Sequence, residues 1–445
     1  MDLEREAEIP IDKVYTIPAF EIVPHKGFFL AVMPNIARWV VLKNNRQLEI
    51  FNELVRGLQI GKVLELHEDF QDDVQDVLVQ IEATQVDRLK PKSNFTNTRL
   101  HLHLTNQCNM CCPHCYVCAK KAYDNELTTD EVKDLCRYFK ETGGTDVSLT
   151  GGEPTLRLDF FEIVEYISQQ GMKASVYTNG LNWSEEKIKK LSMCSVDGVQ
   201  ISVDGYDERT NSIFRNKGAF LRALEVIDMM IKNNIHIKIS VTPPFEALVE
   251  NHRKYIDFAR CLLDKYGEDR LEINFSYALM PGREMTTEFI DSIRERYRSY
   301  IDEIVRTIRP HSKEDSFVAN ISDCVYDSCG YGGLNVLANG DFYFCDRLSD
   351  VVSNGNIRKL PFAEIRRLMV LAEEAGKIDH FRPCKDCVLK YICGGGCRAE
   401  YFRQFTQLKS VENVDYDGIE PRKCSDNDKE RIYDLMLKTT EMFYR

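Results

Sequence analysis

Hydrophobic residues in the middle of the chain recur alternately at the spacing of strands and at the spacing of helices. A helical pattern follows each of six runs that are typical of buried strands, at 100–105, 146–150, 173–178, 199–203, 236–242 and 271–277. The first helix is marked at both ends, because Thr128 and Glu131 form a capping box and Gly143-Gly144 follows its last turn. Six strand–helix repeats predict an α/β fold in which right-handed crossovers join a parallel sheet.

Residues 1–95 carry a different pattern and are predicted to form a small unit of their own. Two short apolar runs predict strands on either side of a turn at 33–35, and two helical patterns follow at 48–55 and 74–81. Short strands followed by helices are typical of a winged-helix-like module. Such a module serves either to bind a partner or only to pack against a neighbouring domain, and the sequence leaves both open.

Composition and charge exclude several classes of protein. The chain has 445 residues, of which 43% are hydrophobic and 29% charged, as in an ordinary globular protein of two or three domains. The acidic start lacks the features of a secretory signal, and no apolar run approaches the ~18 residues of a membrane span, so we expect a cytoplasmic protein without membrane contact. A net charge of −12 argues against nucleic acid as the main partner, although a local basic patch stays possible.

The 16 cysteines, in a chain without an export signal, point to thiolates that bind metal rather than to disulfides. The densest group contains Cys108, Cys112 and Cys115 in a Cys-x3-Cys-x2-Cys spacing. Three such thiolates can bind three irons of a [4Fe-4S] cluster and leave the fourth iron open, which is the arrangement of a catalytic rather than a purely electron-carrying cluster. Cys111, Cys115 and Cys118 satisfy the same spacing, but the preceding strand leads directly to Cys108 and favours the first register.

With this motif the chain resembles the radical SAM enzymes, in which S-adenosylmethionine chelates the open iron. That family has an aromatic ring just before the last cysteine, where His114 stands; the alternative register offers Val117. The resemblance implies a partial (β/α)6 barrel over residues 96–310, with its site at the C-terminal ends of the strands. It also implies an external one-electron reductant of the flavodoxin or ferredoxin type, and a 5'-deoxyadenosyl radical that takes a hydrogen atom from the substrate.

Residues that follow the first four strands fit the same resemblance. The family uses a GGEP motif to hold the amino group of S-adenosylmethionine; glycines let the backbone approach a ligand, and a carboxylate accepts hydrogen bonds from an ammonium group. By the same resemblance Ser202 and Arg215 contact the ribose and carboxylate of this cofactor, and Tyr116 flanks its adenine; a place in the core is the alternative for Tyr116. For the asparagine and the aspartate of the set, turn or capping roles are the alternative. The implied cofactor-binding residues are His114, Tyr116, Gly151, Gly152, Glu153, Pro154, Asn179, Ser202, Asp204 and Arg215.

Cysteines become dense again in residues 311–445, a region predicted to contain a bridging segment and a second iron–sulfur domain. Their spacing resembles the SPASM extension of radical SAM enzymes, which holds two auxiliary [4Fe-4S] clusters and brings the implied total to three. The resemblance assigns the ligands in two sets of four, Cys324, Cys329, Cys345 and Cys397, and then Cys384, Cys387, Cys393 and Cys424. Spacing alone would as easily exchange Cys397 and Cys424, and a pair of structural zinc sites is the alternative use of these thiolates.

Asp346 directly follows one of the implied cluster ligands, Cys345. In anaerobic sulfatase-maturing enzymes, whose layout is similar, an aspartate at that point is the proposed base. The resemblance therefore implies that Asp346 is catalytic and takes a proton from a substrate thiol or hydroxyl. A structural role beside the cluster loop is the alternative.

Residues 1–95 resemble the peptide-recognition elements that are fused to maturases of ribosomal peptides. Together with the barrel, this implies capture of a precursor peptide through its leader, which adds as a strand to an exposed sheet edge. The core peptide then receives an intramolecular thioether or carbon–carbon cross-link, as in sactipeptide, ranthipeptide and streptide-type maturases. The alternative enzyme is an anaerobic sulfatase-type maturase that forms formylglycine, which the N-terminal unit argues against. A non-enzymatic iron–sulfur carrier or zinc scaffold leaves the GGEP motif unexplained.

Overall fold

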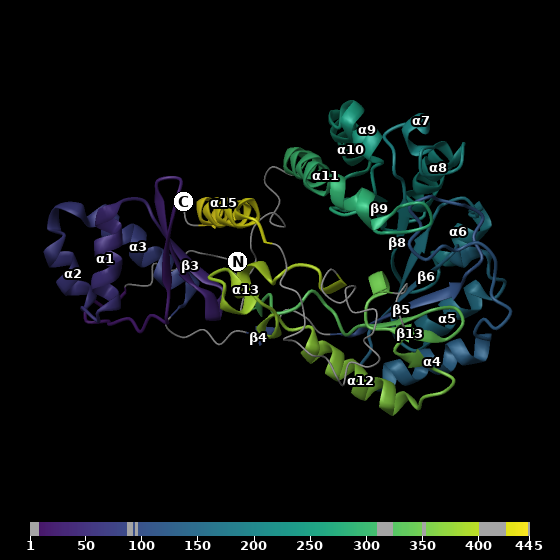
Figure 1. The fold of residues 1–445 in the computed structure, drawn as a ribbon, viewed down its shortest axis with the longest axis horizontal. Helices are drawn as coiled ribbons and strands as arrows, with labels where there is room; N and C mark the ends of the chain where they lie inside the picture. Colours follow the sequence, from purple (N-terminus) through teal and green to yellow (C-terminus); the bar gives the residue numbers. More distant parts are fainter. Residues whose placement is uncertain are drawn as a thin grey trace.

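The computed structural model describes residues 9–86, 92–93, 97–308, 324–348, 353–399 and 424–443. Figure 1 shows two lobes: the purple N-terminal elements lie at one end and the blue and teal strand–helix repeats at the other. The green and yellow C-terminal elements contact both lobes, so the first and last parts of the chain meet.

A nine-stranded sheet forms the larger lobe, in the order β10-β9-β8-β7-β6-β5-β12-β13-β14. Its first six strands are parallel and lie in chain order, which confirms the predicted strand–helix repeats and is the strand arrangement of an open (β/α)6 barrel. These strands are β5 (Arg99–Thr105), β6 (Asp146–Gly151), β7 (Lys173–Thr178), β8 (Val196–Ser202), β9 (Ile237–Val241) and β10 (Leu271–Phe275).

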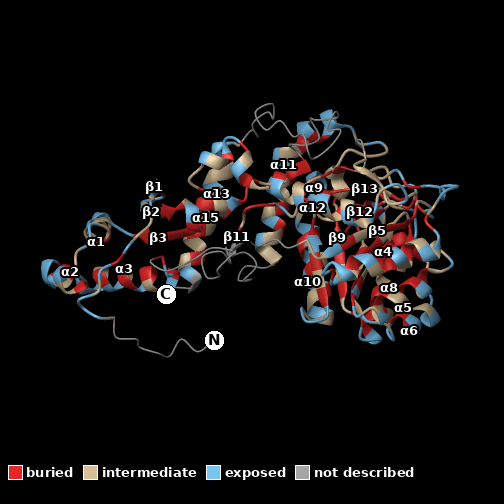
Figure 2. Cartoon of the chain, turned by 90° about the horizontal axis from the view of Figure 1, so that it is seen from below, coloured by how far each residue is buried: buried red, intermediate tan, exposed pale blue. Residues whose placement is uncertain are grey.

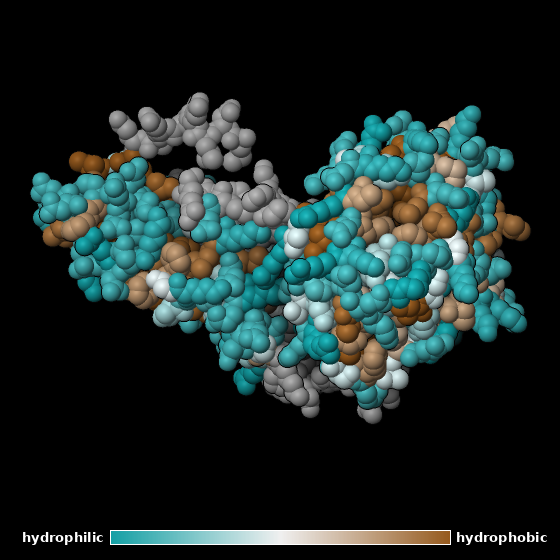
Figure 3. Space-filling view, turned by 90° about the horizontal axis from the view of Figure 1, so that it is seen from above, coloured by the Kyte–Doolittle hydropathy of each residue, from teal (hydrophilic) through white to brown (hydrophobic). Residues whose placement is uncertain are grey.

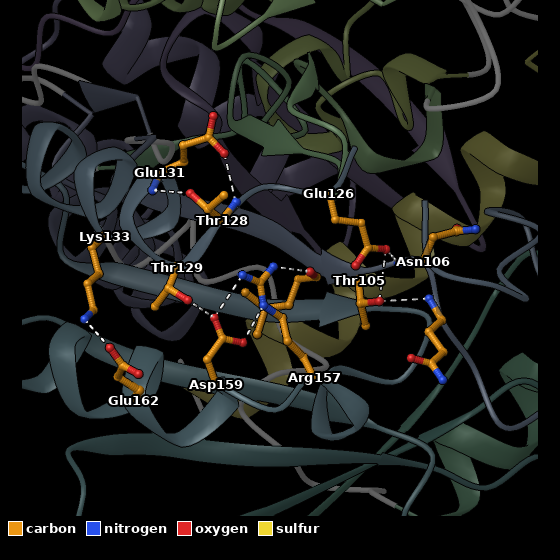
Figure 4. Close-up of polar contacts among 12 residues, drawn as sticks. Thr105, Asn106, Glu126, Thr128, Thr129, Glu131, Lys133, Arg157, Asp159 and Glu162 are labelled. Carbon is orange, nitrogen blue, oxygen red and sulfur yellow. Dashed lines mark hydrogen bonds and ion pairs between the residues drawn. The ribbon is translucent and has the colours of Figure 1, made fainter. Parts of the chain in front are cut away.

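Helices follow these strands and pack against one face of the sheet. They are α4 (Thr129–Glu141), α5 (Phe160–Gln169), α6 (Glu185–Leu191), α7 (Glu208–Asn211), α8 (Ala219–Lys232), α9 (Phe245–Asn251), α10 (Arg253–Tyr266) and α11 (Thr287–Ile308). The predicted capping box is present at α4, where Thr128 N donates to Glu131 Oε2 at 2.8 Å and Glu131 N donates to Thr128 Oγ1 at 3.3 Å (Figure 4).

The two faces of the sheet differ in polarity because successive side chains of a strand point to opposite sides. On β5, Leu100, Leu102 and Leu104 are fully buried in the main core with residues of the crossover helices (Figure 2). His101 and His103 alternate with them and therefore face the inner side of the open barrel. This inner, polar face is the one on which a substrate can be bound.

Three short strands from the C-terminal region extend the sheet beyond β5. β12 (Leu334–Val336) runs parallel to β5, β13 (Asp341–Tyr343) pairs antiparallel with β12, and β14 (Gly355–Asn356) pairs antiparallel with β13. A separate two-stranded pair joins β4 (Lys92–Ser93) to β11 (Cys324–Val325). The remaining C-terminal elements that bear on the site are η6 (Asp346–Leu348), α12 (Phe362–Ala375), η8 (Cys384–Asp386), α13 (Lys390–Cys393) and α15 (Asp426–Phe443).

The N-terminal unit is an antiparallel sheet of β1 (Glu21–His25), β2 (Phe28–Met33) and β3 (Arg38–Leu42), followed by α1 (Asn45–Val55), α2 (Ile60–Leu66) and α3 (Gln71–Thr84). The two expected strands and two expected helices are present, and β1 and α2 are additional. One face of this sheet packs on α1 and α3, while Leu30, Trp39 and Val41 on the other face pack against α13 and α15. Trp39 Nε1 donates to the Met436 carbonyl oxygen at 3.2 Å, which ties the unit to α15.

Hydrophilic residues predominate on the surface seen in Figure 3, with hydrophobic patches on both lobes. Among the described helices, none combines the length and the hydropathy that crossing a bilayer requires.

Candidate active site

The predicted cysteine triad lies in the loop that leaves β5. Main-chain hydrogen bonds close this loop, from Cys108 N to the Lys120 oxygen at 3.2 Å and from Lys120 N to the Asn106 oxygen at 3.0 Å. Cys108, Cys112 and Cys115 are half-buried, whereas the two cysteines that define the alternative register, Cys111 and Cys118, are exposed.

The three half-buried thiols share one electrostatic environment. Burial and the neighbouring Cys112 and Cys115 raise the pKa of the Cys108 thiol to about 11. Burial also raises the pKa of Cys112, which the positive charge of Arg215 opposes. Burial makes the thiolate form unfavourable, and a bound metal cation offsets that free-energy cost, since a coordinating thiol loses its proton outright. The converging soft donors therefore fit an iron–sulfur cluster by their chemistry. In the part of the chain that is described, no three cysteine, histidine or carboxylate side chains are arranged to hold a single metal ion.

Glu126 and Arg283 hold the triad loop and were not singled out from the sequence. Glu126 Oε1 accepts hydrogen bonds from Asn106 N at 2.7 Å and from Thr105 Oγ1 at 3.0 Å, at the point where β5 ends (Figure 4). Arg283, far along the chain, donates from Nη1 to the Cys112 oxygen at 3.0 Å. No local motif marks either residue, because their role depends on contacts across the fold.

The glycines of the GGEP motif are required by the packing of β6 against the triad loop. A Cβ atom on Gly151, whose φ is +132°, would lie 2.3 Å from the Thr105 oxygen, and one on Gly152 would lie 2.1 Å from the Gln107 oxygen. Gly152 N instead donates to the Thr105 oxygen at 2.7 Å. The motif thus positions the cysteine loop, a structural reason for these glycines that holds whether or not they also contact a cofactor.

Glu153 is fully buried and its carboxylate bridges the ends of β6 and β7. It accepts hydrogen bonds from Thr155 Oγ1 at 2.6 Å, from Thr178 Oγ1 at 2.8 Å and from Asn179 N at 2.8 Å. Burial raises the pKa of Glu153, and these hydrogen bonds oppose that rise. Pro154 begins a short 3-10 helix directly after it. The predicted contact of Glu153 with a cofactor ammonium group stays a prediction.

Asp204 and Arg215 form a buried ion pair beside the triad. Arg215 Nε donates to Asp204 Oδ2 at 2.5 Å, and Asp204 Oδ1 accepts from Thr242 N at 3.0 Å. His114 Nε2 lies 3.5 Å from the same Asp204 oxygen, and burial lowers the pKa of His114 to about 4, so its ring is neutral at physiological pH. Ser202, the last residue of β8, is half-buried and lies in register with Ser240 of β9.

Tyr116 and Asp346 connect the triad loop to the C-terminal cysteines. Tyr116 Oη lies 3.5 Å from Asp346 Oδ2, and the Cys345 sulfur lies 3.8 Å from Asp346 Oδ1. Burial, followed by the charge of Asp346, raises the pKa of Tyr116 well above its ordinary value. The implied base therefore lies between the two cysteine regions.

The C-terminal cysteines gather in two places. Arg398, directly after Cys397, donates from its main-chain N to the Cys329 sulfur at 3.3 Å, and Arg347 Nη1, two residues after Cys345, lies 4.0 Å from the Cys397 sulfur, so the loops that carry these three thiols meet. Burial, followed by the charge of Asp346, raises the pKa of Cys345. The side chain of Cys324, the fourth residue of this implied set, lies outside the described residues.

The second group of C-terminal thiols consists of Cys384, Cys387 and Cys393. Burial raises the pKa of Cys387, and the charges of Cys384 and Cys393 add to this effect. Burial, followed by the charge of Cys387, raises the pKa of Tyr433 to about 12. The assignment of Cys424 to this second group stays a prediction.

Residues 102–255, from β5 into α10, match the family model described as the radical SAM superfamily. The chain contains a radical SAM domain. This domain spans the cysteine triad, the GGEP motif and the Asp204–Arg215 pair, and its strands and helices form an α/β fold.

Curated relatives include a maturation protein, a maturase and a heme synthase. The sporulation killing factor maturation protein SkfB of Bacillus subtilis is 34% identical over 32% of this chain and 34% of its own length, so the match spans about a third of that relative. The mycofactocin maturase MftC of Mycolicibacterium smegmatis is 28% identical over 74% of this chain and 84% of its own. The AdoMet-dependent heme synthase of Methanosarcina barkeri is 28% identical over 67% of this chain and 90% of its own.

Two solved structures share the fold. Streptococcus suis SuiB bound to its precursor peptide SuiA has a TM-score of 0.50 and 14% identity, and covers 90% of this chain and 98% of its own. Native anSMEcpe with bound AdoMet and the Cp18Cys peptide has a TM-score of 0.52 and 19% identity, and covers 78% of this chain and 98% of its own.

Proposed function

We propose that this protein is a maturase of a ribosomally synthesised precursor peptide, in which it installs an intramolecular thioether or carbon–carbon cross-link. The observation that carries the proposal is the joining of a radical SAM domain to an N-terminal sheet-and-helix unit that has a cavity at the edge of its sheet. Relatives named as maturases of a killing factor and of mycofactocin support it. The enzyme works in the cytoplasm with an external one-electron reductant of the flavodoxin or ferredoxin type.

The triad Cys108, Cys112 and Cys115 would hold the catalytic [4Fe-4S] cluster. When bound, this cluster supplies the electron that cleaves S-adenosylmethionine. Around it, Arg215 and Arg283 place positive charge beside the thiolates, and Asp204 fixes the guanidinium of Arg215 at 2.5 Å. The neutral His114 stacks on Phe214 with ring centroids 4.4 Å apart, which closes one side of the site to water.

Two auxiliary [4Fe-4S] clusters belong to the proposal, in a C-terminal SPASM domain. The proximity of Cys329, Cys345 and Cys397, and that of Cys384, Cys387 and Cys393, supports two separate sites. Asp346 would act as the base, since it lies between the first of these sites and Tyr116 of the triad loop. One auxiliary cluster would accept the electron left after the cross-link closes.

The leader would bind at the free edge of β3. A cavity of about 280 Å³ lies there, lined by β3, by α3 and by the end of α15, with Val41 and the half-exposed Val79 on its walls. An extended peptide can add to such an edge through main-chain hydrogen bonds. At Val41 this edge is closed in the free protein, because Gln80 Oε1 accepts from Val41 N at 2.8 Å and Gln80 Nε2 donates to the Val41 oxygen at 2.9 Å.

A sulfatase-type maturase that forms formylglycine is the second candidate. The fold shared with anSMEcpe and the aspartate directly after Cys345 favour it. The two candidates differ in the product: a cross-link removes two hydrogen atoms and leaves no new carbonyl group, whereas formylglycine is an aldehyde.

Co-expression with the short peptide encoded beside the gene, followed by mass spectrometry, tests the proposal. We expect a peptide that has lost two hydrogen atoms, does not react with hydroxylamine, and resists fragmentation between the linked residues. An aldehyde-reactive product would establish the sulfatase-type alternative, and an unmodified peptide beside active cleavage of S-adenosylmethionine would contradict both.

A further inference from the structure

A cavity of about 250 Å³ lies on the inner side of the barrel where β5 ends. Three segments that are distant in sequence enclose it: the end of β5, the loop that follows the triad, and the turn between β12 and β13. The lining residues that carry the argument are His103, Thr105, Tyr116, Tyr123, Leu337 and Ala338.

His103 is the unusual member of this lining. Its side chain is 4% exposed, and its Nε2 atom has no hydrogen-bond partner. Burial lowers the pKa of His103 to about 3, so the ring is neutral and Nε2 can donate or accept one hydrogen bond according to its tautomer. Buried polar atoms are nearly always paired, and leaving one unpaired costs free energy. A ligand that pairs with Nε2 would remove that cost.

The remaining walls suit an aromatic ring. Tyr116, Tyr123, Leu337 and Ala338 present aromatic and aliphatic surface. The volume of about 250 Å³ exceeds the ~150 Å³ of an apolar cavity that is known to admit benzene. Asn106, Thr105 and Cys118 complete the lining with polar groups. A ring that carries a polar group therefore matches both the aromatic and aliphatic part of the walls and the unpaired nitrogen of His103.

The cavity also lies beside the predicted site of reaction. Tyr116 directly follows Cys115 of the triad, and its hydroxyl oxygen lies 3.5 Å from Asp346 Oδ2, which belongs to the auxiliary cysteine region. A side chain in the cavity is therefore held between the two cysteine regions, where an adjoining residue of the same peptide can reach the reacting centre.

We propose that this cavity receives an aromatic side chain of the substrate peptide that ends in a hydrogen-bonding group, such as tyrosine, and that His103 Nε2 pairs with that group. The inference rests on the proposed function, since it names a feature of the peptide that this site would recognise. His103 is then a positioning residue that selects and orients the peptide without reacting.

The test uses two blocked amino acids as probes, N-acetyl-tyrosine amide and N-acetyl-phenylalanine amide, which differ by one hydroxyl group. Calorimetric titration of the reconstituted full-length enzyme with S-adenosylmethionine should give roughly tenfold tighter binding of the tyrosine probe, the effect of one hydrogen bond to a buried group. In His103→Leu this preference should vanish while Tm stays the same or rises, because an unpaired polar atom has been removed. His103→Gln, which can place an amide group near the position of Nε2, should recover part of it.

Ser148→Ala is the matched control. Ser148 is also fully buried with an unpaired hydroxyl, and it is in register with His101 on the same side of the sheet but outside the cavity. This variant should keep the tyrosine preference. Absence of binding by either probe, or a preference that survives in His103→Leu, would overturn the proposal. A His103-dependent preference in an enzyme that leaves its co-expressed peptide unmodified would instead contradict the proposed function and leave this binding site standing.

Discussion

At the scale of single residues, burial separates the cysteines of the loop after β5 into two classes. Cys108, Cys112 and Cys115 are half-buried beside Arg215 and influence one another's protonation, whereas Cys111 and Cys118 are exposed. Sequence spacing alone fits both sets. The difference in burial supports the prediction that the first set binds the cluster.

Replacing Cys108, Cys112 and Cys115 together by alanine should remove one cluster of three. Anaerobically reconstituted enzyme should bind about twelve irons and this variant about eight, with cleavage of S-adenosylmethionine abolished. The double variant Cys111→Ala, Cys118→Ala is the control and should keep both the iron and the cleavage. Loss of activity in the control, with retention in the single variant Cys108→Ala, would assign the cluster to Cys111, Cys115 and Cys118 instead. Zinc in place of two of the clusters would contradict the SPASM assignment.

Two variants of Glu153 can separate its contribution to the stability of the fold from its predicted contact with the cofactor. Glu153→Ala leaves the Asn179 N–H and two threonine hydroxyls without their buried acceptor, which should lower the free energy of unfolding by about 1–3 kcal/mol. Glu153→Gln keeps an oxygen for Asn179 N, but Thr178 Oγ1 already accepts from Gly180 N and Trp183 Nε1 and cannot also accept from the new amide, so this variant should lose less stability than Glu153→Ala but not none. If the carboxylate also contacts the cofactor, Glu153→Gln should bind S-adenosylmethionine more weakly at a temperature well below its Tm, as equilibrium dialysis would measure. Unchanged affinity would limit Glu153 to its bridging role.

At the scale of elements, the free edge of β3 is closed by a side chain that imitates a peptide group. The amide of Gln80 makes two hydrogen bonds with Val41, one in each direction, as a neighbouring strand would. A leader that adds to β3 must displace this amide. Gln80 therefore weakens leader binding while it protects the edge from unwanted strand pairing.

Gln80→Ala should increase the affinity for the full precursor peptide about fivefold, because the peptide no longer competes with the amide for two hydrogen bonds. Fluorescence anisotropy of a labelled leader would measure this. Gln75→Ala is the matched control, since Gln75 lines the same cavity from the same helix but is exposed. Equal affinities for the two variants would mean that the leader does not use the edge at Val41.

The elements also show how far the sequence alone leads. The six strands of the barrel and the helix capped by Thr128 could be predicted, because each is long enough to show a clear hydrophobic period. β12, β13 and β14 have three residues or fewer, too short for any period, so their addition to the sheet beside β5 could not be foreseen. The cysteine and GGEP motifs could be read locally, whereas the loop contact of Arg283 and the cavity around His103 exist only after distant segments meet.

At the scale of the whole molecule, the N-terminal unit is anchored to the C-terminal cysteine region. Its sheet packs on α15, which begins two residues after Cys424, and His25 Nε2 lies 2.7 Å from Asp434 Oδ1 of that helix. Deleting residues 1–95 would uncover the apolar side of α15 around Met436. Variants of the full-length chain therefore test leader binding more cleanly than a truncation does.

The central claim is that a tethered leader delivers the core peptide to the radical SAM domain. The most direct test compares, with the intact enzyme and concentrations well below saturation, the rate of cross-linking of the full precursor and of the same core without its leader. Tethering raises the local concentration of the core, so the account predicts roughly a hundredfold faster modification of the full precursor, with a scrambled leader behaving as no leader. Equal rates for the full precursor and the leaderless core would contradict it.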